Sequence, residues 1–581
     1  MCGIAGIISL ERSKINEHIL TQMGTSLAHR GPDGKATWIS NDGYAGFSHR
    51  RLTIIDTSEA AAQPMHYAGS YTIIHNGEIY NYIELREELK KKGYEFKTVS
   101  DTEVILAAYA HYGEKCVEYF DGMFSFAIWD DYTKILFCAR DRFGEKPFYY
   151  TEDNGFYFAS EIKAFSVAGI PSDHDNGMLL YFLGSGNTLD PSDSSRTFYR
   201  RIKKLPASHW LKYDVRNSAV TIKKYWEASR EVSSIKVNEA LERLNELLTL
   251  SVKRRLRSDV PIGTSLSGGL DSSSIAACLS EMQVRNLKTF TASFPGFEKD
   301  EAGKAKKVAD KFNLRNMVVT PTSADLANDL EKLARFQDEP IASTSVYAQF
   351  RVFELAAKEN VTVLLDGQGA DEVLGGYDHY RNWRLKSLFP AFAARVLERR
   401  GRRELFDPSI NRGFAESAAK EINIVKPVVH RLNDLLYFDT FCAGLEQLLR
   451  YADRNSMAHS REVRLPFLNH ELVSFAFSLP ASLKIHGGFT KWLLRKVMHG
   501  RLPDEIVWTK RKIGFEPPQK KWMEHKGMQE ILIEARKNLV KDGILDKVVL
   551  GQRLSANEAF NRRAYAWRWL ATSIFMHKKG V

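Results

Sequence analysis

The stretch PIGTSLSGGLDSSSIAACLSEM, from Pro261 to Met282, contains an apolar run, a turn rich in glycine and serine, and a helical period in direct succession. This order predicts a buried strand, a loop at SGGLDSS (Ser267–Ser273) and a helix that begins at about Ser272. Paired glycines let the backbone approach an anion, the serines add hydroxyl donors, and the helix N-terminus supplies unpaired N–H groups with positive dipole. The stretch therefore predicts a phosphate-binding loop.

This loop differs from a Walker A loop in two ways. The GK[ST] ending is missing, and an aspartate, Asp271, occupies the loop. An aspartate beside phosphates is consistent with a bound Mg²⁺ ion. The alternative is a glycine-rich turn that only caps a helix.

The regions on either side of this stretch differ in pattern. From about Val237 onward, helices alternate with the apolar runs PIGTSLS, KTFTASF, MVVT and VTVLLD, which predicts a parallel, doubly wound sheet. After about Tyr377 the pattern is mainly helical. From Gly3 to about Tyr157, short β-rich runs with polar turns predict mostly antiparallel sheets with a few helices. The segment from about Pro171 to Tyr225 is expected to be irregular, as the end of a first domain and a linker.

Composition limits the class of protein. A chain of 581 residues, 44% hydrophobic and 26% charged, is globular and long enough for two or three domains. Five cysteines without CxxC spacing argue against a disulfide framework or a zinc site and favour a reducing compartment. No apolar run approaches the roughly 20 residues that span a bilayer. We expect a soluble, cytoplasmic protein.

The formal net charge of +11 admits nucleic acid, a membrane surface or anionic substrates as partners. Part of the excess lies in KKKG (Lys90–Gly93) and in RVLERRGRR (Arg395–Arg403). Flanking glutamates and apolar residues at helical spacing indicate solvated helix faces. Because no RNP, zinc-finger or helix-turn-helix signature is present, the sequence does not favour nucleic acid.

The chain begins MCGIAGI, with Cys2 directly behind the initiator methionine. Removal of Met1 would leave Cys2 with a free α-amine, whose pKa near 7.7–8.0 in model compounds makes it a base beside the thiol. The opening residues can therefore encode a nucleophile with its own base. Taken alone, they also fit an ordinary N-terminal cysteine.

Four further segments supply what a glutamine pocket needs: LAHRGPDG (27–34), SHRRLTIID (48–56), NGEIYN (76–81) and SDTE (100–103). Arg51 could bind the substrate α-carboxylate through two hydrogen bonds. Glu78 and Asp101 could accept its α-ammonium. The Asn76 side chain and the Gly77 N–H could form an oxyanion hole, in which each donor is worth roughly 2.7–4 kcal/mol.

With these motifs in this order, the first half resembles the glutaminase of N-terminal-nucleophile amidotransferases, as found in glutamine-dependent asparagine synthetases. SGGLDSS resembles the pyrophosphatase loop of the same family, LLDGQGADEVLGGY (364–377) resembles its second signature, and YADRNSMAHSREVRLPFLN (451–469) resembles a segment beside its synthetase site. The resemblance covers essentially the whole chain. It implies an αββα sandwich of antiparallel sheets at residues 2–212, followed by a doubly wound ATP-pyrophosphatase domain with a helical C-terminal part at residues 232–581.

The resemblance also implies a reaction. Cys2 would attack the glutamine side-chain amide, a thioester would form, and ammonia would pass through an internal channel to a carboxylate activated by ATP as an acyl adenylate, with AMP and pyrophosphate as products. The implied partners are glutamine, ATP, Mg²⁺ and a carboxylate acceptor, with no nucleic acid and no membrane insertion; a homodimer is the assembly considered. The implied nucleotide residues are Leu266, Ser267, Gly268, Gly269, Leu270, Asp271, Ser272, Ser273, Ala292, Asp366, Gly367 and Lys491, and the implied magnesium ligands are Asp271 and Asp371.

Two departures from the family concern the acceptor. Where the family has a glutamate that is thought to act as base, this chain has Gln368, which cannot take a proton at neutral pH. Either another group such as Asp366 or Glu372 serves as base, or the acceptor differs. The segment DEPIASTSVYAQF (338–350) contains no arginine or lysine for a dicarboxylate substrate. Gln368, Asp371 and Glu372 are the candidate acceptor-site residues.

Three functional hypotheses remain open on the sequence. The first is the family default, amidation of L-aspartate. The second is amidation of a different carboxylate, such as a uronic acid sugar of a surface polysaccharide. The third is a regulatory paralogue that binds nucleotide or glutamine without turnover, and the intact Cys2, Arg51, Asn76, Asp271 and Asp371 weigh against it.

Overall fold

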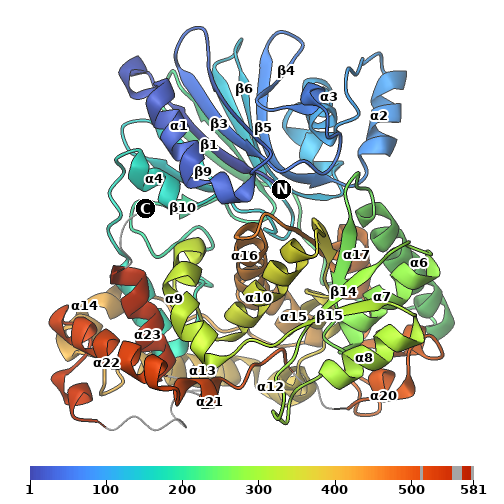
Figure 1. Cartoon of the computed structure of the whole chain (residues 1–581), viewed down its shortest axis with the longest axis vertical. Helices are drawn as coiled ribbons and strands as arrows, with labels where there is room; N and C mark the ends of the chain where they lie inside the picture. The colour runs from blue at the N-terminus through green and yellow to red at the C-terminus, as the bar shows by residue number, and fades with distance from the viewer. Residues whose placement is uncertain (511–513, 553–564, 578–581) are drawn as a thin grey trace.

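The computed structural model describes residues 1–510, 514–552 and 565–577 (Figure 1). Its N-terminal part contains two six-stranded antiparallel sheets. In spatial order, the first consists of β10 (Lys203–Lys204), β8 (Tyr149–Glu152), β9 (Phe156–Ala159), β1 (Gly3–Ile8), β3 (Ala45–Arg51) and β2 (Gly34–Ile39). The second consists of β12 (Ala219–Lys224), β11 (His209–Asp214), β7 (Ile135–Arg140), β6 (Gly122–Asp130), β5 (Tyr71–Ile79) and β4 (Met65–Tyr67).

The two sheets stack with helices outside them. Ile4 and Ile8 of β1 join Trp129 of β6 in the core between the sheets, whereas Ala5 and Ile7 face the layer of α1 (Glu17–Ser26) and α4 (Lys163–Val167). This alternation follows from the two-residue period of a strand. Helices α2 (Tyr82–Lys91) and α3 (Asp101–Tyr112) cover the second sheet (Figure 1). The expected αββα sandwich is confirmed.

The segment from about Pro171 to Tyr225 corrects one expectation, because it is not largely irregular. It contains α5 (Asn176–Ser185), β10, β11 and β12, so the second sheet continues to Lys224, beyond the expected boundary at residue 212. Two of these strands are recognisable only by their partners, since β10 has two residues and β12 is an exposed edge strand.

The second half is built on a five-stranded parallel sheet, as expected. Its spatial order is β15 (Arg315–Val319), β14 (Lys288–Ala292), β13 (Ile262–Ser265), β16 (Val363–Leu365) and β17 (Glu462–Arg464). From β13 the chain moves outward through α7 (Leu270–Glu281) and α8 (Ala302–Lys311), then returns through α9 (Ser323–Gln337) and α10 (Ser345–Lys358) to β16 on the other side of β13. Right-handed crossovers place these two sets of helices on opposite faces.

This order creates a switch point between β13 and β16. The two strands are in register, with Ile262 opposite Val363 and Thr264 opposite Leu365, so the SGGLDSS loop after β13 and the DGQG loop after β16 leave the sheet at the same edge. Open α/β sheets bind ligands in the crevice at such a point. The fold therefore brings the two sequence signatures together.

The remaining helices make the C-terminal part mainly helical, as expected. They are α6 (Val237–Arg255), α11 (Ala370–Leu374), α12 (Trp383–Leu388), α13 (Pro390–Leu405), α14 (Arg412–Ala418), α15 (Leu432–Phe441), α16 (Gly444–Met457), α17 (His470–Ser478), α18 (Ala481–Lys484), α19 (Trp492–Met498), α20 (Asp504–Val507), α21 (Gln519–Met523), α22 (Lys526–Lys541) and α23 (Tyr565–His577). None of the helices in the described parts of the chain has the length and apolar character needed to cross a membrane.

Candidate active site

Cys2 lies buried at the start of the central strand β1. Its backbone N–H donates to Asn76 Oδ1 at 3.0 Å, and its thiol lies 4.0 Å from the carbonyl of Leu52. Burial raises the pKa of the thiol above its ordinary value. In this chain Met1 is still attached, and its ammonium forms a buried ion pair with Glu462 of β17 at 3.1 Å. Removal of Met1 would turn the backbone nitrogen of Cys2, which already donates to Asn76 Oδ1, into a free α-amine.

Two buried carboxylates, those of Glu78 and Asp101, flank the N-terminal residues. Asp101 accepts a hydrogen bond from the N–H of Ile79 at 2.8 Å, yet burial raises its pKa to about 6. Burial, and then the charge of Asp101, raises the pKa of Glu78 well above its ordinary value. Glu78 Oε2 is buried and accepts no hydrogen bond from the described residues. A buried carboxylate of this kind favours a cation beside it, which fits the predicted contact with the glutamine ammonium.

The Asn76–Gly77 pair lies on β5 where it meets β6. Gly77 has φ +145°, and a Cβ there would lie 2.0 Å from the carbonyl oxygen of Met123, so only glycine permits this approach. The side-chain amide of Asn76 donates to Ser125 Oγ at 3.5 Å. The neighbouring strand thus orients the amide that the oxyanion hole would use.

Arg51, at the end of β3, is held by the loop that follows it. Its guanidinium donates to the carbonyl of Ser58 at 2.8 Å and to that of Asp56. Its charge is close enough to Cys2 to act against the effect of burial on the thiol pKa. The structure therefore gathers all six predicted glutaminase residues: Cys2, Arg51, Asn76, Gly77, Glu78 and Asp101.

The nucleotide loop closes on itself through its serines. Ser267 Oγ and Ser272 Oγ lie 3.1 Å apart, and Ser272 accepts from the N–H of Ser267 at 3.2 Å. Gly268 has φ +83°, and a Cβ there would lie 2.6 Å from the backbone nitrogen of Ala305, so this position also requires glycine.

A cavity of about 240 Å³ opens over this loop. Eleven predicted nucleotide residues line it: Leu266, Ser267, Gly268, Gly269, Leu270, Asp271, Ser272, Ala292, Asp366, Gly367 and Lys491. Ser273 is fully buried within α7 and does not line it. The sequence missed other lining residues, among them Lys304 and Arg495, which lie outside both signatures.

Lys491 links the two predicted metal ligands. Its ammonium lies 2.5 Å from Asp271 Oδ2 and 2.5 Å from Asp371 Oδ1. Although burial acts to lower it, these carboxylates raise the pKa of Lys491. Two aspartates that converge on one cation fit Mg²⁺, which takes one or two carboxylates together with substrate phosphates. Within the described ranges, no group of three or more His, Cys, Asp or Glu side chains is placed to hold a metal alone.

A second cavity, of about 800 Å³, adjoins the first. The two share Gln349, Gln368, Asp371 and Phe515, and all three acceptor-site candidates, Gln368, Asp371 and Glu372, line the second. Gln368 Oε1 is buried and has no hydrogen-bond partner among the described residues. Glu372 is buried and accepts from the hydroxyl of Tyr377 at 2.5 Å.

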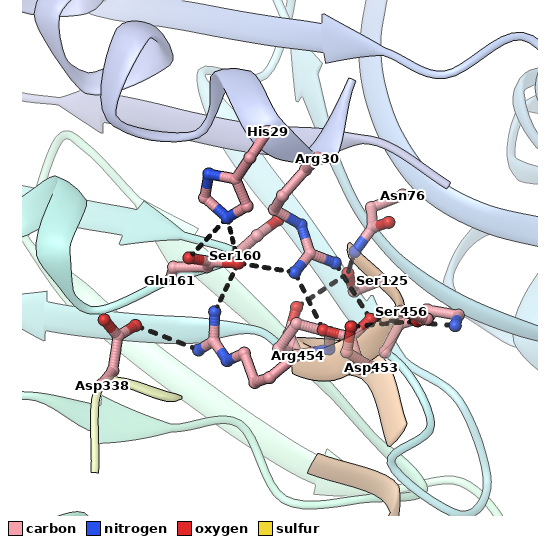
Figure 2. A network of polar contacts seen from close by, with 12 residues as sticks. His29, Arg30, Asn76, Ser125, Ser160, Glu161, Asp338, Asp453, Arg454 and Ser456 are labelled. Carbon is pink, nitrogen blue, oxygen red and sulfur yellow. Dashed lines mark hydrogen bonds and ion pairs between the residues drawn. The ribbon is translucent and has the colours of Figure 1, made fainter. Parts of the chain in front are cut away.

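A buried polar network connects the glutaminase residues to α16 (Figure 2). Arg30 donates from Nε to the carbonyl of Cys2 at 3.0 Å, and its two other nitrogens bind Asp453 at 2.9 and 3.0 Å. Arg30 also binds Glu161 at 2.8 Å, and Arg454 pairs with Glu161 at 2.7 Å. The quoted motifs contain Arg30 and Asp453, but no sequence signal pairs residues this far apart.

Comparisons with known proteins agree with this geometry. Residues 243–577 match the family model described as asparagine synthase, and residues 1–226 match the model described as glutamine amidotransferase domain. Glutamine-hydrolysing asparagine synthetase 1 of Bacillus subtilis is 34% identical over 90% of this chain and 88% of its own, and asparagine synthetase 3 of the same organism is 32% identical over 95% and 93%. A protein named amidase chry2, from Gibberella zeae, is 27% identical over 97% of this chain and all of its own.

Proposed function

Since this chain belongs to the asparagine synthase family of glutamine-hydrolysing ligases, we propose that it adenylates a carboxylate with ATP and amidates it with ammonia from glutamine. AMP and pyrophosphate are the proposed products. The observation that carries this proposal is the meeting of two cavities at Gln368 and Asp371, with the SGGLDSS loop beneath one of them. We assign the glutaminase domain to residues 2–212, extended to Lys224 to include β12, and the synthetase domain to residues 232–581.

In the glutaminase half, we assign Cys2 as nucleophile and its freed α-amine as base. Glu78 and Asp101 take the glutamine ammonium, and Arg51 takes its carboxylate. Asn76 and Gly77 stabilise the oxyanion. This assignment rests on the hydrogen bond between Cys2 and Asn76 and on the two buried carboxylates beside it.

In the synthetase half, the nucleotide phosphates would lie over SGGLDSS. Asp271 and Asp371 would hold Mg²⁺, which neutralises charge on the pyrophosphate leaving group. Lys491 would then turn from the carboxylates toward the phosphates. The test is product analysis: with ATP and the acceptor, AMP and pyrophosphate should form in equal amounts, and ADP with inorganic phosphate would contradict the loop assignment.

L-Aspartate is the default acceptor of the family, but the second cavity favours another candidate. The α-carboxylate of aspartate calls for a cation, and among the described lining residues the one cation is Lys299, which forms an ion pair with Glu516 at 2.6 Å. Eight of the other lining residues carry hydroxyl or amide groups, Ser343, Thr344, Ser345, Gln349, Gln368, Tyr377, Tyr451 and Gln519, and four carry carboxylates, Asp371, Glu372, Asp378 and Glu516. A volume of about 800 Å³ is that of a pocket for a drug-sized ligand. We therefore propose a larger, polyhydroxylated acid, such as a uronic acid sugar, as an alternative acceptor to aspartate.

The base for the attack of ammonia is also a proposal. Gln368 can accept a hydrogen bond from ammonia but cannot take its proton. Glu372 lines the acceptor cavity with a tyrosine hydroxyl at 2.5 Å, whereas Asp366, whose pKa burial raises to about 6, lines the nucleotide cavity. Glu372 is the candidate on the acceptor side.

A pyrophosphate-exchange screen over aspartate, free uronic acids and nucleotide-linked uronates separates the two acceptors. Exchange with aspartate alone would remove the sugar acid. The variant Gln368→Glu sharpens the result, since a general base contributes about 10²–10⁴-fold. If aspartate is the acceptor and lacks only the base, this variant should gain activity with it. If the cavity is built for a sugar acid, it should not.

A further inference from the structure

Helices α12 and α13, with Phe389 at the junction between them, expose a row of apolar side chains that lie close together in the sequence. These side chains are largely open to solvent: Leu385 (70% exposed), Leu388 (67%), Phe389 (71%), Phe392 (69%) and Val396 (46%). Single exposed apolar residues are common, but a contiguous group that includes two phenylalanines marks an interaction site.

The opposite side of α13 is already covered. Ala394 and Leu405 are buried, and α13 packs against α5. Gly401 lies so close to Ile424 that a Cβ would come within 2.9 Å of it. This packing fixes the orientation of α13, so Phe392 and Val396, on the side opposite Ala394, face outward. In Figure 1 both helices lie in the lower half of the molecule, away from the antiparallel sheets.

Basic side chains surround this row. Between Trp383 and Leu405 the sequence has seven arginines and lysines and two glutamates. Arg400 pairs with Glu404 at 3.5 Å. The other arginines are exposed and form no ion pair with any described residue: Arg384, Arg395, Arg399, Arg402 and Arg403. The basic run Arg395–Arg403, which the sequence indicated as a solvated helix face, therefore adjoins the apolar row.

We propose that this α12–α13 surface docks on an anionic lipid surface. An interfacial helix inserts phenylalanine and leucine at the headgroup boundary while arginines contact anionic headgroups, and the row and its arginines are arranged in this way. Two other occupants fit less well. Nucleic acid would leave the apolar row in water. A second copy of this chain would place like charges against one another across a symmetric contact.

The surface lies close in sequence to the acceptor cavity. Tyr377 and Asp378 line that cavity, and the short helix η5 (Asp378–Asn382) leads from them directly into α12. The docking itself does not depend on the identity of the acceptor.

Flotation of the full chain with vesicles tests the proposal, using phosphatidylcholine alone or mixed with phosphatidylglycerol. The chain should float with the mixed vesicles and not with phosphatidylcholine. Phe389→Ser with Phe392→Ser should weaken the partition on the order of 100-fold, given the burial energy of two apolar side chains. Arg399→Gln with Arg403→Gln should weaken it by about 25-fold, from about fivefold per arginine.

The matched control is Lys90→Gln with Lys91→Gln, in the other basic run, which should bind vesicles as the unaltered chain does. The melting temperature and both activities of every variant confirm that it is folded, since none of these residues lies in the proposed sites. Binding that is unchanged in both α12–α13 variants would overturn the proposal. It would also be overturned by equal binding to both vesicle types, or by an absence of vesicle binding together with self-association or RNA binding that depends on these residues.

Discussion

The two reaction centres of this chain are built in opposite ways. The thiol, the Asn76 side chain and the carboxylate pair proposed for the glutaminase half are buried, and before processing Met1 packs beside them. The synthetase half has two joined cavities, of about 240 and 800 Å³, at the edge of an open sheet. A site for one small substrate and the water that hydrolyses its thioester can be small and enclosed. A site that must admit ATP and a second substrate needs space. The residues of its acceptor cavity can differ without disturbing the glutaminase site.

This contrast also locates the departures from the family. The glutaminase motifs are complete, and the residues assigned to them lie close to one another. Both departures contribute to the wall of the larger cavity, through Gln368 and through residues 342–346 and 349 of the segment without arginine or lysine. The open site is therefore where this chain differs from the family pattern.

The largest expected effect comes from Cys2→Ala. Loss of the nucleophile should lower glutamine-dependent synthesis by at least about 10⁴-fold, while free ammonia still supports synthesis because the synthetase cavity is separate. Steady-state assays with each nitrogen donor measure this. Cys442→Ala, at a half-buried cysteine outside both sites, is the control. Retained glutaminase activity in Cys2→Ala would show that the closed site is not the glutaminase.

Lys491→Ala should act on the open site alone. Removal of the cation that faces Asp271 and Asp371 should lower ATP-dependent synthesis by about 10²–10³-fold and leave glutaminase activity intact. Because the two carboxylates then repel each other, added Mg²⁺ should raise the melting temperature of this variant more than that of the unaltered chain. Lys496→Ala, at an exposed lysine of α19, is the control. An equal response to Mg²⁺ in both proteins would argue against the aspartates as its ligands.

Asp453→Asn tests the connection between the two halves. Arg30 donates both to the carbonyl of Cys2 and to Asp453, and Figure 2 shows its contact with Asp453. Although burial acts to raise it, the charge of Arg30 keeps the pKa of Asp453 below its ordinary value. Breaking such a buried pair costs about 3–5 kcal/mol. Chemical denaturation should show this loss, and more glutamine should be hydrolysed per product formed.

The control for this prediction is Arg412→Ala, which removes an exposed ion pair with Glu416 and should change neither stability nor coupling measurably. If Asp453→Asn lowers stability but the ratio of glutamine to product stays constant, the network supports the fold without linking the reactions.

The smallest effect is on pH dependence. Burial raises the pKa of Asp101 to about 6, so below that pH the carboxyl is protonated and must lose its proton to bind the glutamine ammonium. Affinity for glutamine should therefore fall by up to about tenfold per pH unit below pH 6. In Asp101→Asn the affinity should be low throughout and this dependence absent. An unchanged profile in the variant would place the ammonium elsewhere.

The stability of the fold should also fall in acid, through a carboxylate whose pKa shift has the opposite sign. In the chain that still carries Met1, although burial acts to raise it, the Met1 ammonium and Arg464 lower the pKa of Glu462 from its ordinary value to about 2. Its contribution to stability is therefore present above about pH 4.5 and is lost as the pH falls toward 2.

The sequence by itself determined the family, the dependence on glutamine and most of the architecture. Cys2, the SGGLDSS loop and the DGQG loop belong to short motifs of consecutive residues. The glycines that the local backbone requires also lie within such motifs, Gly77 in NGEIYN and Gly268 in SGGLDSS. The alternation of helix and strand likewise determined the parallel sheet, because each element carries its own period.

Only the tertiary structure decided what depends on distant partners. Arg30 and Asp453 are 423 positions apart, and β10 and β12 exist as strands only because β8 and β11 lie beside them. The size of the acceptor cavity is set by segments from several parts of the chain. The apolar side chains of α12 and α13 could equally have formed a buried face. Whether they are covered depends on which elements pack against them, and a local sequence pattern does not show this.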